Sequence, residues 1–295
     1  MTKRPTHGRG GRTSRGAARP PTQRELFRRA ARDLGVSAAD YERADILAQI
    51  AELLRRHTAI GRMLAFKGGA VMTLVDRSPR LSADLDAVVV TGGAVHDRQV
   101  RAALLAELGG RRLVTDVGIV NPGRQSLQYP FIKARSFSGL GDVNIRLEVS
   151  WREPPLLPTE TIEVRIPRDV RLAAAAPRLI RLPVLARIER VAEKMRAFLE
   201  RGLDRDAFDL HYQAGPLSSD DRTVLRGLIR RKLLKSELPE GCDLKAQFTT
   251  ALAGAKRTWP RGLVIVAEPP AWADVERTVV ATYEPLLQRR LRRSE

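Results

Sequence analysis

The sequence is poor in the residues that make disulfides, zinc sites and membrane spans. Its 295 residues include one cysteine, Cys242, and four histidines without metal-ligand spacing. A single cysteine excludes an intrachain disulfide and fits a reducing compartment. No apolar run approaches the roughly 18 residues of a membrane span, and the charged N-terminus lacks the apolar segment of a secretory signal. We therefore expect a cytoplasmic protein that makes no membrane contact.

Acidic residues are scarce relative to basic ones. The chain has 34 Asp and Glu against 52 Lys and Arg, which gives a net charge of +18. Such an excess favours a nucleic-acid partner, although a genome that favours Arg and Ala codons is the alternative explanation. Residues 1–21 contain basic but no acidic residues and are rich in Gly, Pro, Ser and Thr. We expect this tail to be disordered, either gripping RNA or only aiding solubility.

The most informative stretch combines a glycine pair with two aspartates. A Lys-Gly-Gly run at residues 67–69 is followed, after fourteen further residues, by Asp84, Leu85 and Asp86. Side chains alternate along a strand, so the aspartates share one face while Leu85 points into the core. Two such carboxylates repel each other unless a cation lies between them, and Mg²⁺ prefers oxygen ligands together with substrate phosphates. Two exposed aspartates at a strand end are the plain alternative.

A second group of charged residues lies between residues 189 and 209. Apolar residues recur there at i, i+4, i+7 and i+8 from Val191, which predicts an amphipathic helix ended by Gly202. Lys194 on this helix can neutralise a triphosphate as a point charge. Asp206 and Asp209 follow as i, i+3 neighbours in a second helix, where Asp209 can orient Lys194 or an attacking hydroxyl. A salt-bridged pair of surface helices is the alternative interpretation.

Together these motifs resemble a known family. Lys-Gly-Gly, Arg-x-Ser-x-Asp-x-Asp, Glu-Lys-x-Arg-Ala and Arg-Asp-x-x-Asp occur in this order over about residues 40–213. The pattern is similar to that of the AbiEii/AbiGii nucleotidyltransferase toxins, which include the mycobacterial MenT toxins and belong to the DNA polymerase β-like nucleotidyltransferases. The resemblance implies a bilobed α/β (α+β) protein that uses an NTP substrate with Mg²⁺ and transfers nucleotides to tRNA. It also implies a cognate antitoxin of the AbiEi type.

The resemblance assigns roles to individual residues. The metal-binding aspartates correspond to Asp84 and Asp86, the motif lysine to Lys194 and the motif aspartate to Asp209. In polymerase β-like enzymes a third carboxylate on a neighbouring strand activates the attacking hydroxyl. Glu148 is our candidate, because it lies on the polar face of an alternating stretch at 143–150, although a solvent-facing glutamate fits that position as well. The nucleotide-binding candidates are Lys67, Gly68, Gly69, Ser82 and Lys194.

Two positions depart from the family pattern. The family often has a hydroxyl residue after the glycine pair, where this chain has Ala70, so one phosphate contact is either missing or supplied by Ser82. A larger apolar residue usually follows the second aspartate, where this chain has Ala87; that change concerns packing more than chemistry.

The chain is long enough for two lobes. We expect a disordered basic tail at 1–21, a nucleotidyltransferase core lobe at 22–155 and a mainly helical lobe at 156–295 that completes the active site. Prolines at 154, 155 and 158 mark the connection. Helices are expected over 41–58 and from 185 onward, and strands over 83–90 and 143–150.

The sequence predicts a toxin of a toxin–antitoxin pair that transfers nucleotides from NTP to the 3′ end of tRNA, which blocks aminoacylation and translation. One rival is a transferase that modifies a small molecule, as aminoglycoside nucleotidyltransferases do, but such an acceptor needs no extended positive field. The other is a non-enzymatic RNA-binding protein on the same fold, which the intact aspartates and Lys194 disfavour. The identity of the NTP and the tRNAs cannot be read from the sequence.

Overall fold

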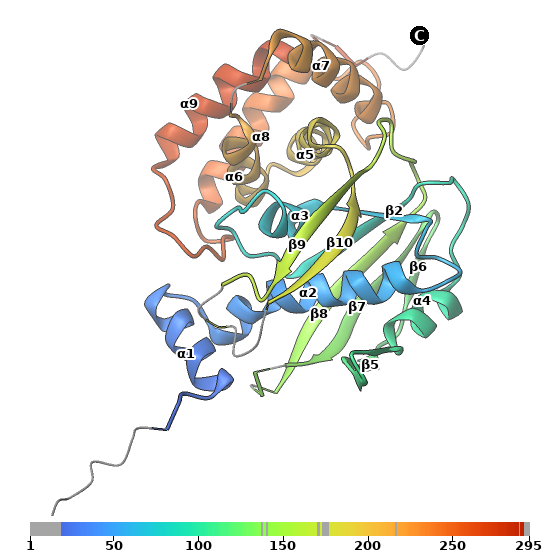
Figure 1. The fold of residues 1–295 in the computed structure, drawn as a ribbon. Coiled ribbons are helices and arrows are strands. Elements are labelled where there is room, and N and C mark those ends of the chain that lie inside the picture. The colour runs from blue at the N-terminus through green and yellow to red at the C-terminus, as the bar shows by residue number, and fades with distance from the viewer. Residues whose placement is uncertain are drawn as a thin grey trace, which may run out of the picture.

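The computed structural model describes residues 19–136, 138–139, 141–169, 172, 177–215, 217–288 and 290–291. Most of the expected basic tail, residues 1–18, lies outside these ranges. The chain forms a mixed α/β structure in which one large sheet is followed by a helical lobe, as Figure 1 shows. The fold class predicted from the sequence is therefore confirmed.

The large sheet has eight strands in the order β5-β7-β8-β2-β1-β10-β9, and β6 pairs with β7 alone. Its strands are β1 Leu64–Lys67, β2 Asp84–Val89, β5 Val114–Val117, β6 Asn121–Gly123, β7 Ser126–Arg135, β8 Asp142–Ser150, β9 Glu160–Ile166 and β10 Arg178–Val184. A separate short pair consists of β3 Glu107–Leu108 and β4 Arg111–Arg112. Strands β2 and β8 run parallel, whereas β1 and β2 run antiparallel.

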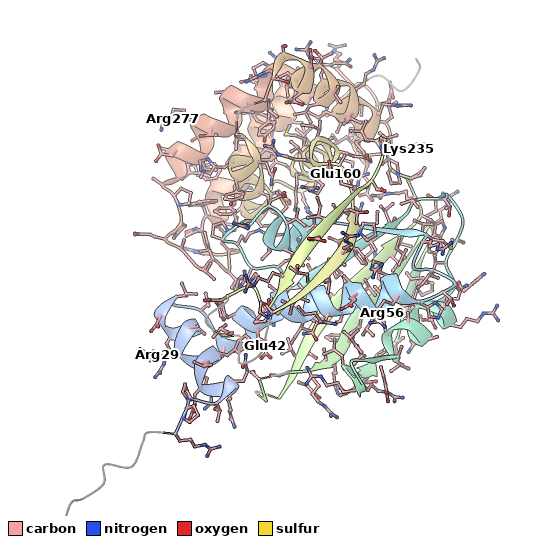
Figure 2. The ribbon with its side chains drawn as sticks, in the orientation of Figure 1. Arg29, Glu42, Arg56, Glu160, Lys235 and Arg277 are labelled. Atoms are coloured by element: carbon pink, nitrogen blue, oxygen red, sulfur yellow. The ribbon has the colours of Figure 1, made fainter. Side chains whose placement is uncertain are left out.

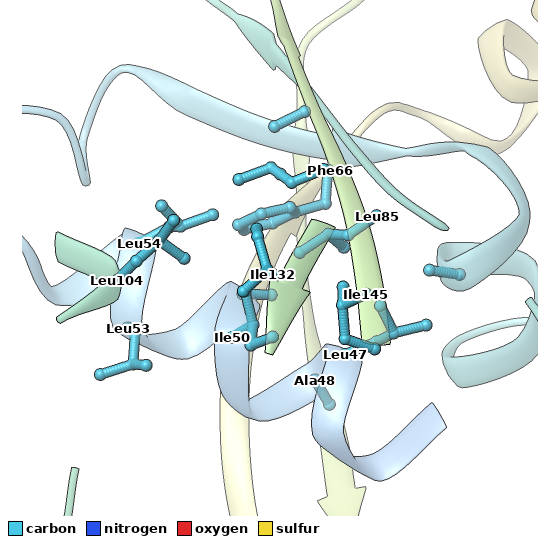
Figure 3. Packing of buried hydrophobic residues seen from close by; sticks show 14 of the residues in the cluster. Leu47, Ala48, Ile50, Leu53, Leu54, Phe66, Leu85, Leu104, Ile132 and Ile145 are labelled. Carbon is cyan, nitrogen blue, oxygen red and sulfur yellow. The ribbon is translucent and has the colours of Figure 1, made fainter. Parts of the chain in front are cut away.

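One face of the sheet is covered by α2, Ala38–Arg56, together with the shorter α4, Asp97–Leu104. The Ser37 hydroxyl accepts the Asp40 N–H at the start of α2, satisfying one of the unpaired helix donors. Leu47 and Ile50 of α2 pack against strand residues such as Phe66 (Figure 3). Each such fully buried side chain contributes roughly 1.5–3 kcal/mol to folding. The opposite face of the central strands therefore remains available for polar side chains.

The helices that follow the sheet form a lobe beside it (Figure 1). It consists of α5 Arg187–Arg201, α6 Asp204–Gln213, α7 Ser219–Leu233, α8 Leu244–Thr258, α9 Trp272–Tyr283 and a 3₁₀ turn at Glu284–Leu286. Phe198 of α5 and Phe248 of α8 meet edge to face in its core, with ring centroids 5.7 Å apart. The helix expected around Val191 is present and ends at Gly202, as predicted. An N-terminal helix, α1 Gln23–Asp33, packs on the first turns of α2.

The expected strands around 83–90 and 143–150 are confirmed as β2 and β8. The sheet itself continues through β10, and the run of helices begins only at Arg187. The boundary at residue 155 between a core lobe and a helical lobe stays a prediction. Basic side chains such as Arg29, Arg56 and Arg277 extend outward from the helices (Figure 2). Within the described ranges no helix is long and apolar enough to cross a membrane.

Candidate active site

Three carboxylates meet on the polar face of the central strands. Residues Asp84 and Asp86 project from β2 on the side opposite Leu85, which is buried. Strand register places Glu148 of β8 directly beside Asp86, and Arg146 directly beside Asp84. The candidate third carboxylate thus lies next to the two aspartates that the sequence predicts to bind metal.

The electrostatics of this cluster suit a cation. Burial raises the pKa of Asp86, and the nearby charges of Glu148 and Asp84 raise it further, whereas Lys67 and Lys194 lower it. The Arg146 Nε lies 2.5 Å from Asp84 Oδ1 and offsets part of the negative charge. Two adjacent carboxylates are sufficient for Mg²⁺, which completes its coordination with water and substrate phosphates. No preformed cage of three or more His, Cys, Asp or Glu ligands occurs in the described part of the chain.

The glycine pair is explained by what lies against it. Gly68 begins α3, Gly68–Leu74, with a φ of +76°, and a Cβ at this position would lie 2.0 Å from Asp86 Oδ2. A Cβ on Gly69 would lie 2.5 Å from Arg80 Nη2 and 2.8 Å from Ser82 Oγ. The two missing side chains therefore make room for Asp86 on one side and for Arg80 on the other.

The predicted hydroxyl of Ser82 lies next to the start of α3 but is largely enclosed. Its side chain is buried, and its Oγ donates to the backbone carbonyl of Asp84 at 3.2 Å and accepts the Asp84 N–H at 3.4 Å. The hydroxyl thus shapes the turn that leads into β2.

Lys194 is held by two aspartates of α6. Its Nζ lies 2.7 Å from Asp209 Oδ2 and 3.6 Å from Asp206 Oδ1. Asp209 is fully buried and also accepts two hydrogen bonds from Arg80, both of 2.8 Å. Although burial alone raises the pKa of Asp209, Lys194 and Arg80 together hold it below its usual value. Asp209 therefore positions Lys194, which is one of the two roles expected for it.

Asp206 holds the guanidinium of Arg201 in a similar way. It is fully buried and accepts two hydrogen bonds from Arg201, of 2.7 and 2.9 Å. The Asp-x-x-Asp motif of α6 thus orients Lys194 and Arg201 on α5.

A cavity of about 200 Å³ separates α5 from the carboxylates. Its basic lining is Lys67, Arg152, Arg190, Lys194, Arg196 and Arg201, and its acidic lining includes Asp86, Glu148, Glu193 and Glu200. Arg196 is 6% exposed; its Nη2 donates to Glu193 at 2.9 Å and its Nη1 lies 3.6 Å from Glu153, whereas its Nε has no hydrogen-bond partner. Six basic side chains around one small cavity fit an anionic ligand such as a triphosphate.

A buried lysine of α7 supports the same wall. The Lys232 Nζ lies 2.7 Å from Glu189, 2.8 Å from Glu193 and 3.5 Å from Glu153. Glu193 in turn pairs with Lys67 at 3.2 Å. The Lys232 side chain is 1% exposed, so this lysine points into the protein and not toward the solvent.

The structure brings most of the predicted residues to one place. Lys67, Gly68, Asp86, Glu148 and Lys194 line the cavity, and Asp84 lies beside it in an adjoining groove with Asp86 and Glu148. Gly69, Ser82 and Asp209 lie directly behind this lining.

Two supporting residues received no role from the sequence. Arg80 was visible as the first residue of the Arg-x-Ser-x-Asp-x-Asp motif, and this was the available signal. The position of Lys232 depends on how α7 packs against α5, for which the sequence carries no signal.

Comparison with known proteins agrees with this architecture. Residues 52–277 match the family described as nucleotidyl transferase AbiEii toxin, type IV TA system. No curated protein matches the sequence significantly. The fold is similar to that of MenT4, a nucleotidyltransferase toxin from Mycobacterium tuberculosis H37Rv, with a TM-score of 0.63, 23% identity and 89% of each chain covered. It is also similar to a putative nucleotidyltransferase from H. pylori, with a TM-score of 0.52, 14% identity, and 85% of this chain and 96% of that chain covered.

The family match extends over most of the chain and includes both the carboxylate strands and the helices that carry Lys194 and Asp209. The protein belongs to the AbiEii family of nucleotidyltransferase toxins of type IV toxin–antitoxin systems.

Proposed function

We propose that this toxin transfers nucleotides from an NTP to the 3′ end of tRNA and so blocks aminoacylation and translation. The observation that carries this proposal is a cavity in which the sheet carboxylates of Asp86 and Glu148 lie opposite several basic side chains of α5, although α5 also contributes Glu193 and Glu200. Asp86 and Glu148 face Lys194 and Arg196 across a space of about 200 Å³. An NTP suits this arrangement, because its phosphates need cations and the hydroxyl that attacks its α-phosphate needs a proton acceptor nearby.

In this proposal Asp84 and Asp86 hold Mg²⁺. The fit rests on their shared face and on the raised pKa of Asp86, which burial and the neighbouring carboxylates cause. When bound, the cation supplies Lewis-acid stabilisation of phosphate charge.

The basic wall binds the triphosphate. Lys194, fixed by Asp209, neutralises the charge of the departing pyrophosphate, and Lys67 lies at the opposite rim beside Gly68. We propose that the N–H groups of Gly68 and Gly69, at the start of α3, donate to the same phosphates. Because Lys194 and Lys67 are already held by carboxylates, the cations are oriented before substrate arrives.

The chemical step is the transfer of the nucleotidyl group, coupled to a proton transfer. The 3′ hydroxyl oxygen of the acceptor forms a bond to the α-phosphorus of the NTP, and the bond from that phosphorus to the β-bridging oxygen breaks. The hydroxyl proton passes to the carboxylate of Glu148, which strand register places beside Asp86. Pyrophosphate leaves with the electron pair of the broken bond.

The macromolecular partners follow from charge and family. A net charge of +18 suits a polyanionic acceptor such as tRNA and disfavours a small-molecule acceptor. Membership of a type IV toxin–antitoxin family implies an antitoxin, which we propose is of the AbiEi type, and a cytoplasmic site of action.

The test is to incubate the protein with Mg²⁺ and each NTP labelled at the α-phosphate, in separate reactions with total tRNA or an aminoglycoside. We expect label on tRNA, and none on tRNA whose 3′ end has been oxidised with periodate. Asp86→Asn should abolish transfer, whereas Leu179→Ala, an exposed change on β10, should not. Label on the small molecule alone, or equal labelling of oxidised tRNA, would contradict the proposal.

A further inference from the structure

Two large apolar side chains stand out on the surface near the carboxylates. Ile119 is 83% exposed and Phe131 is 64% exposed, the highest values among the large hydrophobic residues of the described ranges. The two residues are neighbours, because the N–H of Gly118 donates to the Phe131 carbonyl at 2.9 Å. Ile119 follows β5 directly, and Phe131 lies within β7. Side chains so exposed contribute little to folding, and here two of them lie side by side.

A β-bulge gives Phe131 its position. The register between β7 and β8 pairs Tyr129 with Leu147 and Ile132 with Ile145, so Pro130 and Phe131 together stand opposite Arg146. Tyr129 and Ile132 are buried in the core. The extra residue leaves Phe131 on the solvent side, and bulges of this kind are frequent beside active sites, where they redirect a side chain.

The residue before Phe131 borders the candidate active site. Pro130, its chain neighbour, lines a groove of about 230 Å³ together with Asp84, Asp86, Arg146 and Glu148. Strands β7 and β2 lie on either side of β8, so they are about 10 Å apart at a usual strand spacing of about 4.8 Å. This separation is comparable to one or two nucleotides of single-stranded RNA.

The surroundings of Phe131 are basic. Arg146, which pairs with Asp84, stands between the ring and that carboxylate. Lys133 and Arg135 are exposed residues further along β7, and Lys133 lies 3.8 Å from Asp116 of β5. Arg124 and Arg152 line the pocket that continues past Glu148. An aromatic ring among cations is the combination with which proteins bind single-stranded nucleic acid, since bases stack on the ring and phosphates meet the charges.

We propose that Phe131 is a stacking platform for a base at the single-stranded 3′ end of the RNA acceptor, with Arg146 contacting the adjoining phosphate. The inference rests on the proposed transfer to RNA and adds to it the surface that delivers the terminal hydroxyl to Glu148. The platform binds by stacking and does not read sequence, so it accepts any base at this position. An antitoxin or a second copy of the chain is a less suitable occupant, because two apolar side chains within a basic surface offer little area for a protein interface.

The test compares two RNA hairpins, one with a four-nucleotide single-stranded 3′ tail and one with a blunt end, by fluorescence anisotropy at fixed salt without NTP. Phe131→Ala should weaken binding of the tailed hairpin by roughly 5- to 150-fold and affect the blunt hairpin much less. Phe131→Tyr should bind as the parent does, because the ring is kept. Phe131→Leu should fail like Phe131→Ala, since it keeps apolar area but has no aromatic face. Leu179→Ala, equally exposed at 63% on β10, is the matched control and should change nothing.

The same variants are then assayed for transfer to the tailed hairpin. Phe131→Ala should raise KM for RNA while leaving KM for NTP and kcat near the parent values. Unchanged affinity and unchanged KM for RNA in Phe131→Ala would overturn the platform, even where the parent labels RNA. If the parent labels no RNA, the platform fails together with the proposed function. Light scattering can also detect a complex between the toxin and its antitoxin. If Phe131→Ala loses this complex but still binds RNA, the surface belongs to a protein partner instead.

Discussion

Substitution of Gly68 by alanine tests the geometry of the site through a single methyl group. Gly68 has a φ of +76°, and its added Cβ would lie 2.0 Å from Asp86 Oδ2. Real Cβ atoms do not approach closer than about 3 Å, so the carboxylate of Asp86 must retreat by about 1 Å. A displacement of this size in a catalytic group costs roughly 100-fold in rate. We expect Gly68→Ala to lose nucleotide transfer to about that extent.

The backbone contributes a separate effect. A side chain at positive φ costs about 1–2 kcal/mol, which corresponds to a fall in Tm of roughly 2–8 °C for a protein of this size. Gly35 provides a control for this strain alone, because it has a φ of +68° and an added Cβ would meet nothing within 4 Å. Gly35→Ala should therefore show a similar fall in Tm and keep its transfer rate.

The assay measures the rate of label transfer from NTP to tRNA at saturating substrates, alongside a thermal melt of each variant. Loss of activity confined to Gly68→Ala identifies the contact with Asp86 as the cause. Parental transfer by Gly68→Ala would refute the reasoning, since Asp86 would then tolerate displacement. An equal loss in both variants would show that backbone strain, and not the carboxylate, is responsible.

Three further predictions concern the charges around the site. Lys194→Ala should sharply reduce NTP use, and Lys194→Arg should restore it only in part because a guanidinium is wider; parental NTP affinity in Lys194→Ala would disprove the assignment. Lys232→Met should lower the free energy of unfolding, measured by urea denaturation, by about 3–5 kcal/mol, because the substitution leaves buried glutamates without their cation. A loss below about 1 kcal/mol would be inconsistent with this role. Burial raises the pKa of the Asp45 carboxyl to about 6 in the folded protein, whereas the unfolded chain keeps the ordinary, lower value. As pH rises from about 4 to 6, the carboxyl therefore ionises first in the unfolded chain, and the parent should lose about 3 kcal/mol of stability. Asp45→Asn should therefore stabilise the protein more at pH 7 than at pH 4, and an equal effect at both pH values would rule this out.

Part of the site could be predicted because it depends on local periodicity. Asp84 and Asp86 share a face in any strand, and their spacing alone placed them together. Lys194 and Asp209 were identified by the resemblance to the family, and the expected helix boundary at Gly202 explains how their two helices come to lie side by side. The sequence thus contains the chemistry of the site and the elements that carry it.

The rest depends on pairing between distant segments. The position of Glu148 beside Asp86 is set by the register of β2 with β8, and a shift by one residue would turn the carboxylate into the core. The bulge that exposes Phe131 is an irregularity in strand pairing, which alternation cannot predict. The contact between Lys232 and Glu193 requires the packing of α7 on α5. Such relations follow from tertiary structure and leave no pattern within one segment.

The segment from Asp76 to Ser82 connects the sheet to the helical lobe at several points. Arg80 reaches Asp209, Arg190 contacts Asp76 at 2.6 Å, and the Tyr212 hydroxyl donates to the Asp76 and Arg77 carbonyls at 3.1 and 3.0 Å.

Backbone bonds add to these links, since the Leu81 N–H donates to the Val264 carbonyl at 2.7 Å and the Val266 N–H donates to the Pro79 carbonyl at 3.0 Å. A hinge between the two halves would have to break charge-assisted contacts that are shielded from water, and these are among the strongest in proteins. We therefore expect the sheet and the helical lobe to keep a fixed separation across the cavity. If the proposed reaction takes place in this cavity, we expect substrate to enter a gap of preset width and pyrophosphate to leave by diffusion, without an opening of the two halves.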